Sequence, residues 1–207
     1  MVISDAQHFL FVHVQKTGGS TIDNRLDEVL PDSRQVKGID RHATLGQIIK
    51  AEPALASYWT VGFVRNPWAR MLSWFRMVER FKERADKGRR GADTFLKKNQ
   101  FIRGDAEACP DFETFVMQGP DQWTRLRTPQ VRYLTSATRR ADFIGRQETL
   151  EADLRAVFAR LELPWEPLQS VNVDKNRPDY RELYTDPMRR RIEEIFAKDI
   201  AAFDYKF

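Results

Sequence analysis

The sequence has few of the residues that build disulfides and metal centres. Its 207 residues include a single cysteine, Cys109, and three histidines, His8, His13 and His42. One cysteine excludes an intrachain disulfide, and the histidines are too scattered to form a cluster with metal-ligand spacing. We therefore expect that the protein needs no metal.

Long apolar runs are also missing. No stretch of about 18 apolar residues occurs, so we expect no transmembrane helix and no stable membrane insertion. The first residues, Met1 to Asp5, lack the basic segment with which a signal peptide begins. We expect a soluble, cytoplasmic protein.

The composition that remains is typical of a folded domain. Hydrophobic residues make up 42% and charged residues 31% of the chain, which excludes disordered and membrane classes. We predict one domain over residues 1–207 with a sizeable core. The net charge of +4 suits a polyanionic ligand. No nucleic-acid recognition motif occurs, so we expect no nucleic-acid partner, and nothing in the sequence indicates an oligomeric state.

Strand-like apolar runs alternate with helical periodicity along the chain. We predict strands at 8–14, 58–64 and 142–145, each followed by a helix, at 20–30, 67–81 and 148–161. A short strand at 34–37, a helix capped by Thr44 that runs through Lys50, and a last helix that opens at Asp186 complete the pattern. It predicts an α/β fold with a mainly parallel central sheet flanked by helices, whose ligands bind at the carboxyl ends of the strands.

The first predicted strand leads into six residues that suit an anion: Lys16, Thr17, Gly18, Gly19, Ser20 and Thr21. A strand, a glycine turn and a helix together gather backbone N–H groups around a phosphate. The lysine adds a charge, and the hydroxyl residues add donors. The segment is not a Walker A motif, because Lys16 precedes both glycines. A glycine turn with an incidental lysine is the alternative interpretation.

The second predicted strand also ends in a candidate anion site. Arg65 stands at its carboxyl end, Asn66 suits a helix N-cap, and Pro67 suits the first helical position. Arg70 and Ser73 lie on the same helix face as Asn66. A guanidinium and a hydroxyl can bind a phosphate monoester at two points. Taken alone, the two arginines favour the alternative interpretation, in which they are surface charges and Ser73 only fills the helix.

Together the two motifs resemble those of the sulfotransferases that use 3′-phosphoadenosine 5′-phosphosulfate (PAPS), in particular the carbohydrate-type family 2. In that family Lys-Thr-Gly-Gly-(Ser/Thr) binds the 5′-phosphosulfate, and Arg-(Asn/Asp)-Pro-x-x-Arg-x-x-Ser-x-Phe binds the 3′-phosphate. Residues 16–20 and 65–75 match these motifs. Residues 142–148 and the amphipathic helix after them resemble the third strand and helix of the family, and residues 184–185 and 199–205 resemble its closing helix. One departure is Gln15, where many relatives have proline.

The resemblance implies a P-loop-NTPase-like fold and transfer of a sulfuryl group from PAPS to an acceptor hydroxyl, or in second place an amine. The product is 3′,5′-bisphosphoadenosine, and the implied acceptor is a carbohydrate or a glycolipid. Lys16 would neutralise the leaving group, Arg65 and Ser73 would hold the 3′-phosphate, and a basic loop with Lys175 and Arg177 would close over the nucleotide. Loop charges exposed to solvent are the alternative for the last two. Golgi relatives carry a membrane anchor, so we expect a bacterial member or a trimmed form of a longer chain.

The general base is open among several residues. His42 stands just before the helix that Thr44 begins, where related enzymes often carry the base, and its ordinary pKa suits the task. His13 is the second candidate, although strand alternation equally predicts a buried, hydrogen-bonded histidine. Asp27 and Glu28 form a third option, because some relatives use a carboxylate after the phosphosulfate loop.

A basic segment at about 82–130 is the candidate acceptor-binding region. We expect it to be a helical insertion that binds an anionic glycan, with a solvated helical excursion as the alternative. Four further residues are candidates to extend this surface: Trp123, Arg125, Arg127 and Gln130. Two other functions stay open, a nucleotide-dependent kinase or other phosphate-loop enzyme, and a non-catalytic nucleotide-binding protein on this scaffold.

Overall fold

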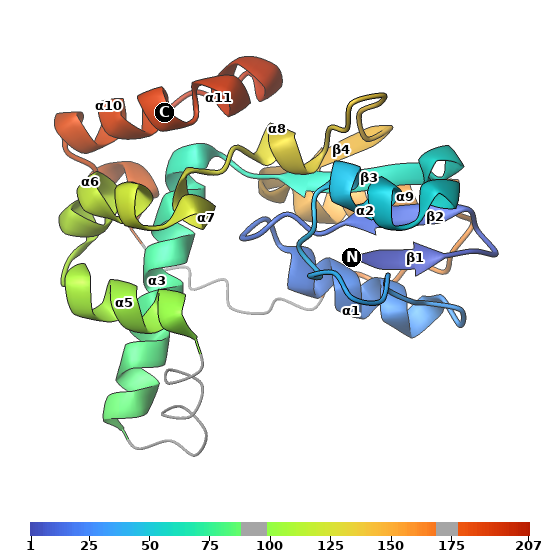
Figure 1. Cartoon of the computed structure of the whole chain (residues 1–207), viewed down its shortest axis with the longest axis horizontal. Helices are drawn as coiled ribbons and strands as arrows, with labels where there is room; N and C mark the ends of the chain where they lie inside the picture. Colours follow the sequence, from blue (N-terminus) through green and yellow to red (C-terminus); the bar gives the residue numbers. More distant parts are fainter. Residues whose placement is uncertain (88–98, 169–177) are drawn as a thin grey trace. The chain divides into compact units, whose positions relative to one another are not determined.

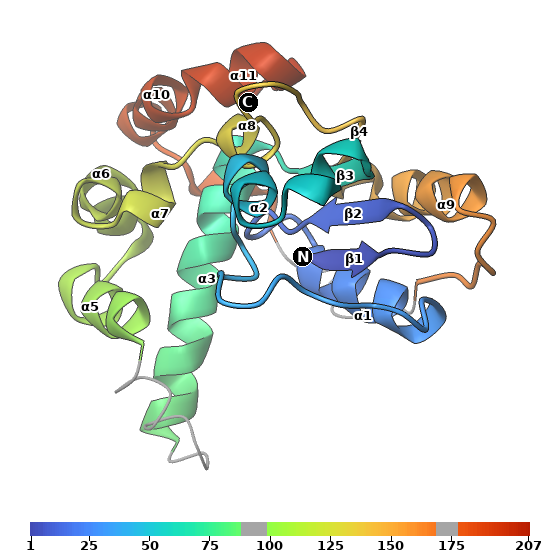
Figure 2. The ribbon, with the colours of Figure 1, turned by 45° about the vertical axis from the view of Figure 1, so that its right-hand side comes forward.

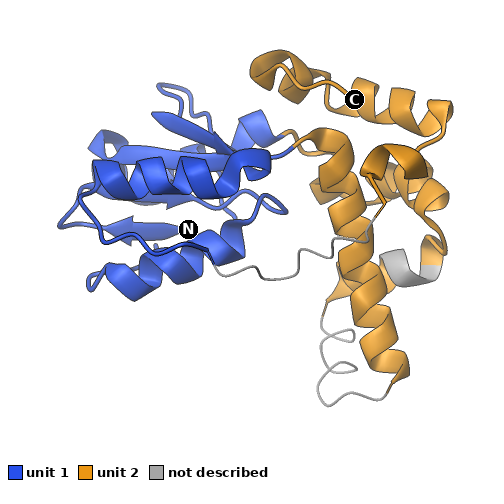
Figure 3. Ribbon diagram, turned by 180° about the vertical axis from the view of Figure 1, so that it is seen from behind, with its two compact units in different colours: residues 1–65, 130–176 blue, residues 66–129, 177–207 orange. Residues whose placement is uncertain are grey.

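The computed structural model describes residues 1–87, 99–168 and 178–207. The chain divides into two compact units (Figure 3). Unit 1 consists of Met1–Arg65 and Gln130–Asn176, and unit 2 consists of Asn66–Pro129 and Arg177–Phe207. The first anion motif, residues 16–21, lies in unit 1. The second motif begins with Arg65, which belongs to unit 1, and its remaining residues belong to unit 2.

Unit 1 is built on a sheet with four strands among the described residues: β1 (Val2–Ser4), β2 (Phe9–Val12), β3 (Trp59–Val64) and β4 (Phe143–Arg146). The strand order is β1-β2-β3-β4 (Figure 1). β2, β3 and β4 run parallel, and β1 pairs antiparallel with β2. The predicted α/β class with a mainly parallel sheet is therefore confirmed, and β1 is an edge strand that the sequence pattern did not predict.

Helices cover both faces of this sheet. On one face, side chains of β2 and β3 such as Phe11 and Phe63 pack against Ile22 of α1 (Gly19–Val29) and Leu154 of α9 (Leu150–Arg160). Figures 1 and 2 show α2 (Leu45–Ala51) on the face opposite α9. The strands are buried on both sides, which explains their continuous apolar runs.

The predicted cap of α2 is confirmed. Thr44 Oγ1 accepts a hydrogen bond from the Gln47 backbone N–H, and Gln47 Oε1 accepts one from the Thr44 backbone N–H at 2.9 Å. This capping box satisfies two donors at the start of the helix. Unit 1 also contains the short helices η1 (Pro53–Ser57), η2 (Gln147–Thr149) and α8 (Gln130–Tyr133).

The regular elements that the structure describes in unit 2 are all helices. Its elements are α3 (Pro67–Asp86), α5 (Gln100–Ala108), α6 (Phe112–Gln122), α7 (Thr124–Arg127), η3 (Tyr180–Leu183), α10 (Asp186–Ile195) and α11 (Ala197–Phe203). Aromatic rings pack between these helices; Phe75, for example, lies 5.5 Å from Phe115 between ring centroids. Within the described ranges, no helix combines the length and the apolar character that crossing a bilayer requires.

Two details of the predicted pattern are wrong. Residues 34–37 do not form a strand, because only Arg34 makes a bridge, to Ile3. The side chain of Arg34 is instead held by the carboxylates of Asp5 and Glu52. The helix predicted at 67–81 extends to Asp86, since no glycine or proline lies between Phe81 and Asp86 to end it earlier.

Candidate functional site

The loop after β2 has the backbone shape of an anion site. Lys16 and Gly18 both adopt left-handed φ angles, of 70° and 86°. Left-handed residues interleaved with right-handed ones direct successive N–H groups into a concavity. The conformation suits Gly18 but costs Lys16 about 1 kcal/mol or more, and strain of this kind clusters at ligand-binding sites. α1 begins at once after Gly18, and no side chain of the described residues caps it.

The hydroxyl residues of the loop have different environments. Thr17 is fully buried, and its Oγ1 donates to the Val14 carbonyl at 2.9 Å. Ser20 is exposed and Thr21 is half-buried, both in the first turn of α1. The Thr17 hydroxyl therefore holds the loop to the end of β2. The solvent-accessible hydroxyl groups of the loop are those of Ser20 and Thr21.

His13 lies directly beneath the start of α1. A Cβ atom added to Gly19 would stand 2.2 Å from His13 Nε2, so a larger residue at position 19 would displace the imidazole. His13 itself is only 3% exposed. Its Nδ1 lies 2.8 Å from Asp23 Oδ2, and because a carboxylate can only accept, Nδ1 carries the proton. The interpretation of His13 as a buried, hydrogen-bonded histidine is confirmed.

Asp23 connects three segments of unit 1. It lies on α1, accepts from His13 of the β2 segment, and pairs with Arg41 Nη2 at 2.5 Å. Burial opposes ionisation of the carboxyl, but the hydrogen bond from His13 and the Arg41 charge lower the pKa of Asp23 below its usual value. Burial also lowers the pKa of His13, despite the opposing effect of Asp23. The pair is therefore a neutral imidazole beside a carboxylate.

His42 stands beside His13, with the two ring centroids 4.4 Å apart and the rings edge to face. Its Nδ1 lies 3.2 Å from the His13 carbonyl oxygen. A carbonyl can only accept, so Nδ1 is the protonated nitrogen and Nε2 bears the lone pair. Burial, with a smaller contribution from His13, lowers the pKa of His42 to about 4. At neutral pH this histidine is an uncharged acceptor of protons at Nε2.

The carboxylates of the third base option lie at the other end of α1. Asp27 is eight residues beyond Gly19, which corresponds to about 12 Å along a helix. Its side chain accepts from Ser33, and Glu28 pairs with Arg25 at 2.6 Å. Both residues are exposed, and their ion-pair and hydrogen-bond partners lie away from the loop.

Arg65 follows β3 at the same sheet edge as the loop. β2 and β3 are parallel, with Val12 opposite Gly62, so their carboxyl ends lie side by side. The backbone of Arg65 is held at two points by one side chain: Gln130 Oε1 accepts from the Arg65 N–H, and Gln130 Nε2 donates to the Arg65 carbonyl, both at 2.8 Å. Gln130 is completely buried. The prediction that it extends an acceptor surface is therefore wrong, because its amide is used inside the unit.

The rest of the second motif belongs to unit 2. Asn66 Oδ1 accepts from the backbone N–H groups of Trp68 and Ala69, which confirms the predicted cap of α3. Ser73 is half-buried on α3. Arg70 is 2% exposed, and its guanidinium lies 5.8 Å from the centre of the Phe196 ring. It is therefore part of the unit 2 core and not a surface charge.

Parts of the predicted nucleotide and acceptor sites lie outside the described residues. These are Lys175 and Arg177, and residues 88–98 of the basic segment. The described part of that segment is helical. Trp123 packs edge to face on Phe101 at 5.6 Å, and the Arg125 guanidinium lies 4.5 Å from the centre of the same ring.

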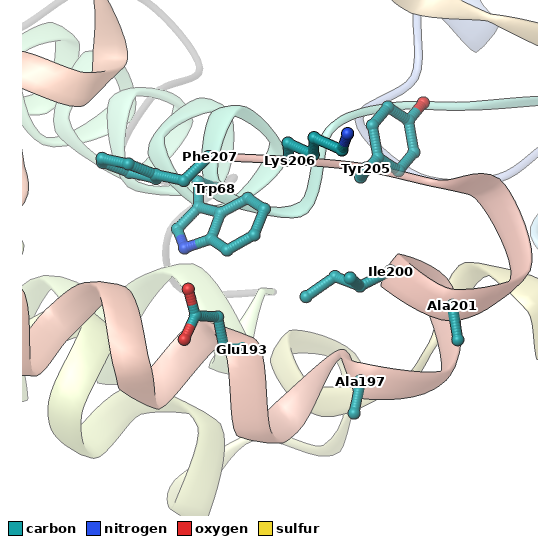
Figure 4. A pocket seen from close by; sticks show the side chains of 8 residues that line it. All are labelled: Trp68, Glu193, Ala197, Ile200, Ala201, Tyr205, Lys206 and Phe207. Atoms are coloured by element: carbon teal, nitrogen blue, oxygen red, sulfur yellow. The ribbon is translucent and has the colours of Figure 1, made fainter.

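Unit 2 has a cavity of about 430 Å³ near the C-terminal residues (Figure 4). It is lined by Trp68, Glu193, Ala197, Ile200, Ala201, Tyr205, Lys206 and Phe207. Trp68 is buried, its Nε1 donates to the Arg189 carbonyl at 3.2 Å, and its ring packs on Phe207. From the described part of the chain, no group of three or more His, Cys, Asp or Glu side chains is placed to hold a metal ion.

The roles that two residues, Asp23 and Gln130, have in the site were not predicted from the sequence. Asp23 carries a weak signal, because it is a charged residue beside Ile22 on the buried side of an amphipathic helix. Gln130 carries none, since its partner Arg65 is 65 residues away.

The comparison with known proteins agrees with the motifs. The model of the sulfotransferase family matches residues 1–206. No curated protein matches the chain. The family match covers the loop at residues 16–21, the second motif and all four described strands, and it confirms the resemblance inferred from the two motifs.

Proposed function

This chain belongs to the sulfotransferase family, and we propose that it transfers a sulfuryl group from PAPS to an acceptor hydroxyl, or in second place an amine. The observation that carries this proposal is the juxtaposition within unit 1. The left-handed loop at Lys16 and Gly18 and the arginine after β3 follow neighbouring parallel strands. Ligands of such sheets bind at this edge, and a doubly phosphorylated adenosine needs two anion sites.

In the proposed complex, the loop binds the 5′-phosphosulfate and Arg65 binds the 3′-phosphate together with Ser73. Backbone N–H groups of Gly18, Gly19 and the first turn of α1, which has no side-chain cap, would contact the 5′-phosphate. Ser20 and Thr21 would add hydroxyl donors, and Thr17 would hold the loop in shape. Lys175 and Arg177 remain candidates to cover the nucleotide.

The proposed reaction is an in-line displacement at sulfur. The acceptor oxygen forms a bond to sulfur while the bond from sulfur to the 5′-phosphate oxygen breaks, which yields a sulfate ester and 3′,5′-bisphosphoadenosine. Charge develops on the departing phosphate oxygen, and the Lys16 ammonium would neutralise it. The acceptor proton passes to the general base.

We assign the base role to His42. Its Nδ1–H is bonded to the His13 carbonyl, so Nε2 is free of a proton, and its low pKa keeps it uncharged at neutral pH. His13 is a poorer base because its ring is buried against Gly19. It would instead support the loop and present its carbonyl to His42.

For the acceptor we propose a carbohydrate or a glycolipid, bound by the basic segment at about 82–130. The arginines that the structure describes there, Arg84, Arg103, Arg125 and Arg127, support an anionic acceptor. Arg125 and Arg127 are both exposed; Arg125 also stacks on Phe101 and would act partly through packing.

The test is transfer of label from ³⁵S-PAPS to a panel of glycans, glycolipids, phenols and amines. We expect a labelled ester with at least one glycan. His42→Ala should lower kcat by about 100-fold or more, the usual range for loss of a general base, and leave the affinity for 3′,5′-bisphosphoadenosine unchanged. The control is His8→Ala, which removes an exposed histidine. Full turnover by His42→Ala would refute the base assignment, and absence of any labelled product would refute the transfer.

A further inference from the structure

At the end of β3, the side chain of Gln130 makes the backbone hydrogen bonds that a neighbouring strand would otherwise make. In an extended strand, the N–H and C=O of one residue point to the same side, and successive residues alternate. Both groups of Thr60 face the β4 side, where they bond to Asp142. By this alternation the groups of Arg65 face the β2 side. β2 has ended at Val12, and the Gln130 amide bonds both groups instead.

These two hydrogen bonds hold the backbone of Arg65 at a position where β2 no longer pairs with the chain that follows β3. Each backbone hydrogen bond of Arg65 to Gln130 is 2.8 Å long, and the amide is fully buried. An amide offers one acceptor and one donor on the same planar group, so Gln130 restrains both position and rotation of the Arg65 peptide. The Cα–Cβ direction of the arginine follows from that peptide.

The helix that carries Gln130 also approaches the other anion motif. α8 is four residues long, and its last residue, Tyr133, places its hydroxyl 3.5 Å from Gln15 Oε1, next to Lys16. The following Leu134 packs on Gly62 of β3, where a Cβ would stand 2.1 Å from its side chain. α8 is thereby anchored on the sheet, and its first residue is held at a set distance from β3.

We propose that Gln130 is a positioning residue that directs Arg65 toward the 3′-phosphate, and that it thereby sets the preference for a 3′,5′-bisphosphate over a 5′-monophosphate. The inference rests on the proposed function. Gln130 does not touch the nucleotide in this account; it holds the backbone from which the guanidinium extends. Its loss should weaken recognition of the 3′-phosphate and leave recognition of the 5′-phosphate intact.

Calorimetric titration with 3′,5′-bisphosphoadenosine and with AMP separates the contribution of the 3′-phosphate to the affinity from that of the 5′-phosphate. We expect wild-type protein to bind the bisphosphate at least 10-fold more tightly than AMP. Gln130→Met, which keeps the length of the side chain without hydrogen-bonding groups, should lose most of that preference with AMP affinity unchanged within twofold. Arg65→Ala should give the same pattern, and the double variant should lose no more than Arg65→Ala alone. Gln118→Met, at an exposed glutamine of α6, is the matched control.

The outcomes are distinguishable. Wild-type protein that binds AMP as tightly as the bisphosphate would overturn the proposed function and this inference with it. A wild-type preference that survives in folded Gln130→Met would overturn this inference alone. If Gln130→Met does not fold, Gln130→Glu replaces it, because its carboxylate retains the bond from the Arg65 N–H and loses the one to the carbonyl. We expect that variant to lose part of the preference, and an unchanged preference would count against the proposal.

Discussion

Two histidines, His13 and His42, are in contact beside the loop at residues 16–21. His13 has its Nδ1 proton directed at Asp23 and its ring against Gly19, whereas His42 has its Nδ1 proton directed at the His13 carbonyl. The tautomer of each ring is set by the acceptor that its Nδ1 faces. In the proposed reaction His42 accepts the proton, and His13 fixes both the base and the loop.

The pH dependence of transfer reports on the base directly. His42 must be uncharged to accept a proton, and burial lowers its pKa to about 4. Below that pH the ring is protonated and activity is lost; above it the base is active. The acid limb of kcat/KM, which reports the free enzyme, should therefore have its midpoint near pH 4, well below the value of about 6.5 for an unperturbed histidine. A steady-state profile with a midpoint above 6 would contradict the assignment.

Asp23 should matter for the rate as well as for stability. Asp23→Asn keeps the shape but removes the charge that holds His13 and Arg41, and its amide can donate to Nδ1 and shift the proton of His13 to Nε2. We expect the free energy of unfolding, measured by urea denaturation, to fall by about 2 kcal/mol. We expect kcat to fall about 10-fold or more. ¹⁵N NMR of the histidines would detect the tautomer change. Asn24→Ala, at an exposed neighbour, is the control, and an unchanged His13 tautomer with normal kcat in Asp23→Asn would disprove the role.

At the scale of elements, the two helices that follow the anion motifs begin differently. α3 is capped by Asn66, which bonds the N–H groups of Trp68 and Ala69. α1 follows Gly18, and among the described residues no side chain caps it. The first N–H groups of a helix need partners, so the uncapped start of α1 is the end suited to a phosphate.

The cap of α3 makes a measurable contribution to stability. Asn66 is buried, caps α3 with Oδ1, and donates from Nδ2 to the Lys206 carbonyl at 2.9 Å. Asn66→Ala removes the cap and the bond, so the free energy of unfolding should fall by about 2 kcal/mol. Asn66→Asp keeps the cap and loses only the donor, and should lie between wild type and Asn66→Ala. Chemical denaturation measures both, and an Asn66→Ala variant as stable as wild type would show that the cap is dispensable.

At the scale of the whole molecule, local signals predicted most of the fold and part of the site. A few consecutive residues were enough to predict each of these features: the parallel strands, the caps at Thr44 and Asn66, and the loop at residues 16–21. β1 was missed because three residues give too short a pattern, and its place is set by pairing with β2. Asp23 and Gln130 act on residues 10 and 65 positions away. Such contacts exist only once the chain has folded, so spacing alone does not predict them.

The most direct test of the account is a crystal structure with 3′,5′-bisphosphoadenosine bound. We predict that the 5′-phosphate contacts Lys16 and the backbone N–H groups of Gly18, Gly19 and Ser20, while Arg65 and Ser73 contact the 3′-phosphate. His42 Nε2 should face the position of the missing sulfuryl group. A nucleotide bound away from the loop, or a 3′-phosphate without contact to Arg65, would contradict the account.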